Sequence, residues 1–143
     1  MPRLYCLNDT NVRAALWQTW QDSRPGTRGG HEEGGFILQG DSGQLFIQRW
    51  DKGEQDTIIL PPHTNCKVGG RDIVASFHTH SNTGSDYLQE PSETDRRAVR
   101  DDPDLKGRFY EGELVISQKT IYLIEPNGQV SEVGKTQDIL AGN

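Results

Sequence analysis

The stretch that most constrains the fold of this chain is residues 72–95, DIVASFHTHSNTGSDYLQEPSETD. It contains patterns typical of a strand, a loop and a helix start, together with two histidines. Residues 73–77 are apolar and rich in strand-forming side chains, and His78 and His80 follow directly. The spacing of these histidines places both imidazoles on one face of a strand. Residues 91–95 carry a proline and a serine that are typical of a helix start. We therefore expect a strand end and a helix start to meet here.

These side chains are of the types that bind metals. His78 and His80 can share one ion, and Asp95 supplies a third ligand if the first turn of the helix returns to the strand end. Three protein ligands leave a fourth position for water, which is typical of a catalytic zinc site. Each half also has an ordinary interpretation, because single histidines are common and Ser92 with Asp95 could be only a helix cap. Iron or manganese would also accept two histidines and one carboxylate.

The order of these residues resembles the signature of the JAMM zinc metallopeptidases, which is a distant glutamate, then H-x-H, then S-x-x-D. Here it is Glu32 or Glu33, then His78-Thr79-His80, then Ser92-Glu93-Thr94-Asp95. The resemblance covers residues 32–126 and is strongest to the bacterial JAB-like branch found in toxin and effector proteins. Two departures concern the loop after the histidines: Ser81 replaces the usual proline, and residues 81–91 form a longer connection than usual.

The resemblance implies a JAMM/MPN-like fold, in which helices flank a curved sheet, and an activity. His78, His80 and Asp95 would hold Zn²⁺, and the glutamate would be the general base. The pattern E-x-G-G-aliphatic favours Glu32, with Glu33 as the alternative, because side chains alternate along a strand. Ser92 would donate a hydrogen bond to the developing oxyanion. The expected enzyme is a hydrolase of peptide or isopeptide bonds.

The polar segment of residues 81–90 has the composition of a flexible insertion. We expect it to overhang the site as a substrate loop, with Gly84 and Asp86 as its candidate residues. The altered loop leaves the substrate open: a protein or peptide, including a ubiquitin-like tail laid along an open strand edge.

Three functional interpretations remain open. The first is a zinc hydrolase, the second is a toxin or effector domain of the same fold, and the third is a non-catalytic MPN-like scaffold that binds a protein partner. A zinc deaminase is disfavoured because the chain has no P-C-x-x-C segment. The 15 basic residues are scattered and the net charge is −6, so a nucleic-acid partner is not expected.

The chain of 143 residues suits one α+β domain, residues 1–143, with a mixed, curved sheet. Caps at residues 8–10 predict an amphipathic first helix, in which Trp17 and Trp20 would be packing residues. Further elements are predicted at residues 34–38, 44–50, 57–60, 73–77, 94–100, 113–117, 120–125 and 129–133. Residues 134–143 are expected to be a loose tail.

Nothing in the sequence predicts a membrane partner or export. The chain has no apolar run of the length that a membrane helix needs, and residues 1–10 do not resemble a signal peptide. Cys6 and Cys66 are too few for a disulfide framework and are expected to be buried or idle thiols. We expect cytoplasmic synthesis, with later delivery as an effector left open.

Overall fold

A mixed seven-stranded sheet, in the order β2-β1-β4-β5-β6-β7 with β3 paired to β4, organises the computed structural model, which describes residues 5–55, 57–84 and 89–141. Only β4 and β5 pair in parallel, and all other neighbours are antiparallel. The strands are β1 (Gly34–Gln39), β2 (Leu45–Arg49), β3 (Lys67–Val68), β4 (Arg71–Thr79), β5 (Glu113–Ile116), β6 (Thr120–Ile124) and β7 (Val130–Lys135).

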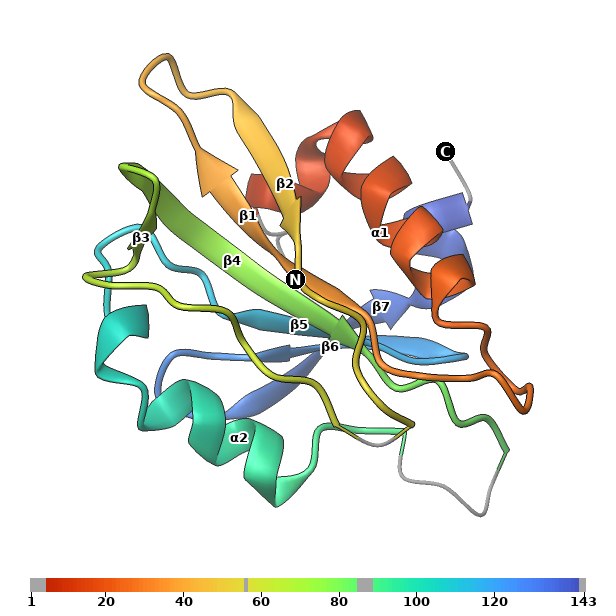
Figure 1. Ribbon diagram of the computed structural model, residues 1–143. Coiled ribbons are helices and arrows are strands. Elements are labelled where there is room, and N and C mark those ends of the chain that lie inside the picture. Colours follow the sequence, from red (N-terminus) through yellow and green to blue (C-terminus); the bar gives the residue numbers. More distant parts are fainter. Residues whose placement is uncertain (1–4, 56, 85–88, 142–143) are drawn as a thin grey trace.

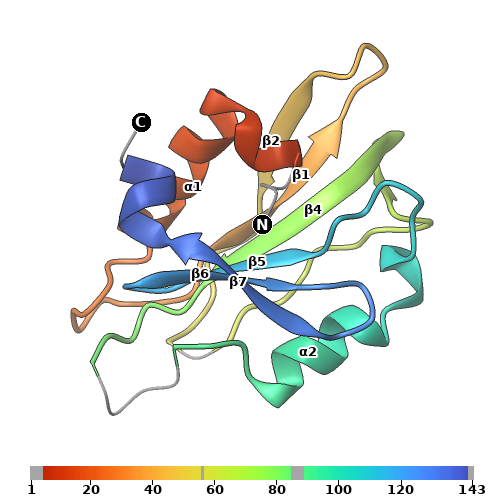
Figure 2. The same ribbon diagram turned by 180° about the vertical axis from the view of Figure 1, so that it is seen from behind.

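Helices cover both faces of this sheet (Figure 1). One face carries α1 (Thr10–Asp22), preceded by the short helix η1 (Tyr5–Asn8), and the C-terminal π-helix η3 (Gln137–Ala141). The other face carries α2 (Glu93–Arg100), which is followed by the single turn η2 (Pro103–Leu105). The reverse view shows the same separation of α1 and α2 by the sheet (Figure 2).

Each face of the sheet has its own hydrophobic core. The core beneath α1 includes Leu16, Phe77 and Leu114, all fully buried. The core beneath α2 includes Phe36, Val99 and Val115. Because strand residues alternate between the faces, each central strand contributes to both cores.

A bulge in β4 decides which of its residues face α2. Ile37 of β1 pairs with Ala75, but the next residue of β1 pairs with Ile73, so Val74 is the extra residue. Val74 and Ala75 both pack in the core beneath α1. The alternation then restarts, which turns Ser76 and His78 toward α2.

The helix starts are set by side-chain caps. Asp9 is the N-cap of α1, and its carboxylate accepts from the backbone N–H groups of Asn11 and Val12. Ser92 is the N-cap of α2, where it forms a capping box with Asp95. Both starts agree with the sequence prediction.

The expected α+β class and mixed sheet are confirmed, as are the first helix, α2 and the elements predicted at residues 34–38, 44–50, 113–117 and 120–125, which form the strands β1, β2, β5 and β6. Cys6 and Cys66 are buried free thiols, as expected. The sheet is open and uncurled rather than curved. Among the described residues, no helix combines the length and the apolar character that crossing a membrane requires.

Two predicted segments are wrong. Residues 57–60 form no strand, and Ile59 is 83% exposed. These residues lie in an irregular loop instead of the sheet. The expected loose tail begins inside β7 and continues as η3. Ile139 and Leu140 anchor it by burial in the core beneath α1. Residues 142–143 lie outside the described chain.

Candidate metal centre

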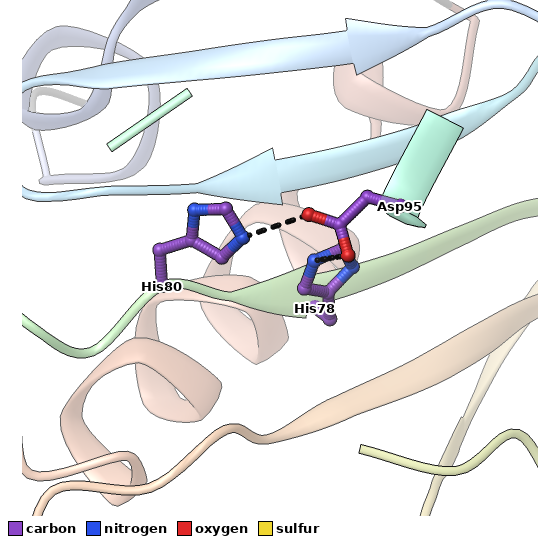
Figure 3. Close-up of side chains that lie close together, drawn as sticks. All are labelled: His78, His80 and Asp95. Carbon is purple, nitrogen blue, oxygen red and sulfur yellow. Dashed lines mark hydrogen bonds and ion pairs between the residues drawn. The ribbon is translucent and has the colours of Figure 1, made fainter. Parts of the chain in front are cut away.

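His78, His80 and Asp95 converge at the C-terminal end of β4, where the first turn of α2 reaches it (Figure 3). Their ligand atoms all lie within 4.8 Å of one another. The Nε2 atom of His80 lies 3.1 Å from Oδ2 of Asp95, and Nε2 of His78 lies 3.6 Å from Oδ1. The sequence-predicted triad is therefore brought together, on two elements that are separated by a long loop.

The capping box of α2 fixes the carboxylate of Asp95. Its Oδ2 accepts from the backbone N–H of Ser92 at 2.9 Å, and its own N–H donates to Ser92 Oγ at 3.0 Å. Burial alone would raise the pKa of Asp95, but His78, His80 and the Ser92 N–H hold that pKa well below its ordinary range. One carboxylate thus caps the helix and faces both imidazoles as an anion.

His80 is oriented by backbone groups. Its Nδ1 donates to the carbonyl oxygen of Gln89 at 3.0 Å, so that Nε2 points at Asp95. Its backbone N–H donates to the carbonyl of Ile116 at 2.9 Å, which extends the pairing of β4 with β5 by one residue. The imidazole position is thereby fixed from both sides.

His78 is held by a buried carboxylate that the sequence analysis missed. Nδ1 of His78 lies 2.6 Å from Oε2 of Glu113, the first residue of β5. Ser76 Oγ donates to the other carboxylate oxygen at 2.8 Å and lies 2.6 Å from the hydroxyl of Tyr110. Since the single hydrogen of Ser76 is given to Glu113, Tyr110 is the donor to Ser76.

This network leaves the Nε2 atom of His78 buried and without a hydrogen-bond partner among the described residues. Burial by itself lowers the pKa of His78, but Glu113 and Asp95 raise it well above its ordinary value. The site therefore favours a positive charge at Nε2, either a proton or a metal cation.

The donor set fits a zinc ion. Two imidazole Nε2 atoms and one carboxylate oxygen are ordinary zinc ligands. Each histidine also donates its other ring N–H to a carboxylate or a carbonyl, Glu113 for His78 and Gln89 for His80, as metal-binding histidines generally do. The unpartnered Nε2 of His78 is the atom that such an ion would satisfy.

Glu32 faces this centre, whereas Glu33 does not. Glu32 is buried and lines a pocket of about 360 Å³ together with His78, Ser92 and Asp95. Burial raises the pKa of Glu32 to about 7; His78 and His80 oppose this rise, and the nearby carboxylates add to it. The pocket thus combines two members of the triad, His78 and Asp95, with a carboxyl group that can exchange a proton near neutral pH.

Glu33 is used elsewhere. One carboxylate oxygen lies 2.5 Å from Nε2 of His31, and the other accepts from Arg49 at 2.7 Å. His31 is buried beside Glu33 as part of this pair. The alternation of neighbouring side chains sends Glu32 and Glu33 to different surroundings.

The remaining candidates lie as follows. Ser92 lines the pocket, and its Oγ accepts from Asp95 N–H, which leaves the hydroxyl hydrogen available to donate. Gly84 is exposed, with a positive φ of 98°, and Asp86 lies outside the described residues. A further histidine, His63, is not part of the triad: its Nε2 lies 2.7 Å from Oδ2 of Asp102.

Comparison with protein-family models, curated proteins and solved structures finds no match to this chain.

Proposed function

We propose that this protein is a zinc-dependent hydrolase of peptide or isopeptide bonds. The observation that carries the proposal is the convergence of His78, His80 and Asp95, with the buried Nε2 of His78 lacking a hydrogen-bond partner among the described residues. The ordered resemblance to the JAMM metallopeptidases supports it, because Glu32, His78, Ser92 and Asp95 line one pocket and His80 converges on Asp95.

Zinc is proposed rather than iron or manganese because the order of the ligands resembles that of the JAMM zinc metallopeptidases. Two imidazoles, each with a fixed hydrogen-bond partner, and one anionic carboxylate would supply three ligands to the ion. When bound, zinc supplies a Lewis acid that lowers the pKa of a coordinated water to about 7.

Glu32 would be the general base. Its carboxyl group has a pKa of about 7, so it can take a proton from the attacking water and return it to the leaving amine near neutral pH. Glu33 is unsuited to this role because both of its oxygens are engaged by His31 and Arg49.

Ser92 would bind the oxygen of the scissile carbonyl as negative charge develops on it. The hydroxyl oxygen is fixed by the Asp95 N–H, and its hydrogen is not used in the contacts of the described residues. Loss of one such donor typically lowers the rate by a factor of about 10². The helix cap therefore also places a donor at the pocket.

The test compares Glu32→Gln with Glu33→Gln, a matched pair of neighbouring substitutions. Both variants should bind about one zinc ion per chain, as the wild type does. Cleavage of a mixed peptide library, and of a peptide joined to a lysine Nζ, is followed by mass spectrometry. Glu32→Gln should lose turnover and Glu33→Gln should retain most of it.

Other results would change the assignment. Full turnover in Glu32→Gln would remove Glu32 from the role of base. Zinc binding without cleavage of either substrate by the wild type would contradict the proposed hydrolase and favour the scaffold interpretation. Death of host cells on expression, abolished by Glu32→Gln, would favour a toxin that uses the same chemistry.

A further inference from the structure

The pocket beside the metal centre has two different sides. The polar side holds Glu32, His78, Ser92, Asp95 and Glu113. The other side, which we call the apolar wall, consists of Trp50, Ile58, Leu60 and Ala98. A purely hydrolytic centre needs only the polar side, so the apolar wall requires its own explanation.

Trp50 is placed next to His78 by a glycine. The backbone N–H of Trp50 donates to the carbonyl of Gly34 at 2.9 Å, and Gly34 pairs with His78 across β1 and β4. A Cβ atom at Gly34 would lie 2.6 Å from Cε3 of the indole. Because paired residues project from the same face of a sheet, the indole occupies the space beside the imidazole of His78.

The indole also carries an unused donor. The Nε1 atom of Trp50 is buried and has no hydrogen-bond partner among the described residues, and the whole residue is 4% exposed. The edge with Cε3 and Cζ3 packs on Gly34, so the edge with Nε1 faces away from β1. A buried tryptophan N–H normally finds an acceptor, because leaving it unpaired is unfavourable.

Ile58 and Leu60 complete the apolar wall from an irregular segment. Both are half-buried, while Ile59 between them is exposed, so the chain alternates as an extended segment does. The volume of about 360 Å³ is at the small end for ligand sites. It suits one side chain and the reacting amide, rather than a large cofactor.

We propose that the apolar wall is the specificity pocket for one uncharged apolar side chain beside the cleaved bond, and that Trp50 Nε1–H binds a backbone carbonyl oxygen of the substrate. This proposal rests on the hydrolase function proposed above and names the substrate class: a peptide-like amide flanked by an apolar residue. Trp50 acts in binding and specificity, and takes no part in proton transfer.

Three hydroxamates test the pocket by calorimetry on the zinc-loaded protein. Acetohydroxamate reports the metal alone, whereas N-acetyl-leucine hydroxamate adds an apolar side chain and a carbonyl oxygen, and N-acetyl-aspartate hydroxamate adds a charge. The leucine compound should bind about tenfold more tightly than acetohydroxamate, because its side chain is removed from water. The aspartate compound should show no such gain.

Three variants test whether the apolar wall causes the gain in affinity of N-acetyl-leucine hydroxamate over acetohydroxamate. Trp50→Phe retains a ring but removes the N–H, and should reduce the gain about threefold while acetohydroxamate binding stays within about twofold. Ile58→Asp should abolish the gain, whereas Ile59→Asp, which substitutes the exposed neighbour outside the pocket, should preserve it. Since the Ile58 and Ile59 variants alter a loop, they remain informative if Trp50→Phe does not fold.

The outcomes separate this inference from the proposed function. If acetohydroxamate binds but the leucine side chain adds nothing, or if the gain survives in Ile58→Asp, the specificity pocket is refuted and the metal centre stands. If Trp50→Phe folds and binds the leucine compound as tightly as the wild type does, the indole donor is refuted. If no hydroxamate binds, both proposals fall.

Discussion

Glu113 accepts a hydrogen bond from His78 Nδ1 over 2.6 Å, and this contact determines which nitrogen of His78 faces the metal centre. With the proton on Nδ1, the lone pair of a neutral imidazole is on Nε2, the atom that faces Asp95. The parallel pairing of β4 and β5 makes the contact possible, because it sets Ser76 beside Glu113 in register.

We predict that Glu113→Gln weakens zinc binding by about 10- to 100-fold. The amide can donate its own N–H to Nδ1 and so favour the tautomer with the proton on Nε2, where it blocks a metal ligand. Competition with a fluorescent chelator measures the affinity. Gln89→Ala is the control, because it keeps the backbone carbonyl that accepts from Nδ1 of His80. The zinc affinity of this variant should remain near that of the wild type.

Glu32 should make the stability of the metal-free protein depend on pH. Its pKa of about 7 in the folded state exceeds the ordinary value of 4.5, so between these pH values the folded state retains a proton that the unfolded state has lost. The stabilisation is present at low pH and is lost as pH rises to about 7. Replacing the carboxyl group in Glu32→Gln should therefore raise the free energy of unfolding, relative to the wild type, most at high pH.

Urea unfolding in the presence of a chelator measures this effect. The free energy of unfolding of Glu32→Gln minus that of the wild type should increase by about 2–3 kcal/mol between pH 4.5 and pH 8. Titrating groups that do not interact with Glu32 are common to both proteins and cancel in this difference. A difference that does not change with pH would contradict the burial of an ionisable Glu32.

His63 and Asp102 should produce a pH dependence of the same sign, because the pKa of His63 is also raised in the folded state. Burial lowers the pKa of His63, but the Pro61 carbonyl and Asp102 raise it above its ordinary 6.5 overall. The stabilising ion pair is therefore complete below pH 6.5 and is lost as pH rises through the pKa of the folded state. Asp102→Asn should cost more stability at pH 5.5 than at pH 9.

The measurement is again urea unfolding of variant and wild type. Asparagine can still accept from the N–H of Asp104, as the Asp102 side chain does now at 2.8 Å, so the turn after α2 keeps its cap. An equal loss at both pH values would show that His63 is not charged in the folded protein.

The C-terminal helix should contribute measurably to stability. Ile139 is 7% exposed and packs in the core beneath α1, so Ile139→Ala should lower the free energy of unfolding by about 2–4 kcal/mol. Asp138 is exposed in the same turn, and Asp138→Ala serves as the control. A loss below about 0.5 kcal/mol for Ile139→Ala would indicate the loose tail expected from the sequence.

Local signals account for the parts of the fold that the sequence predicted. The capping residues Asp9 and Ser92, the hairpin turns and the apolar run of β4 are all readable within a few neighbouring residues. The metal triad was predictable for the same reason. A spacing of two on a strand places both histidine side chains on one face, and a capping box places the aspartate side chain at the helix start.

The parts that were missed depend on tertiary contacts. Residues 57–60 have strand-like composition, but Thr57, Ile58 and Leu60 line the pocket instead. The polar sequence of the tail gave no sign that Ile139 packs beside Gly134. Glu113 was read as a strand residue only, because its pairing with His78 requires the parallel alignment of β4 and β5. A glutamate at the start of an otherwise apolar strand was the available signal.

The measurement that tests the central claim most directly is elemental analysis of the purified chain after zinc loading and gel filtration. The account predicts about one zinc ion per wild-type chain and nearly none in His78→Ala and Asp95→Asn. His63→Ala, which removes a histidine with a similar carboxylate partner, should retain the zinc. Absence of zinc from the wild type, or equal zinc in His78→Ala, would contradict a metal centre at these residues.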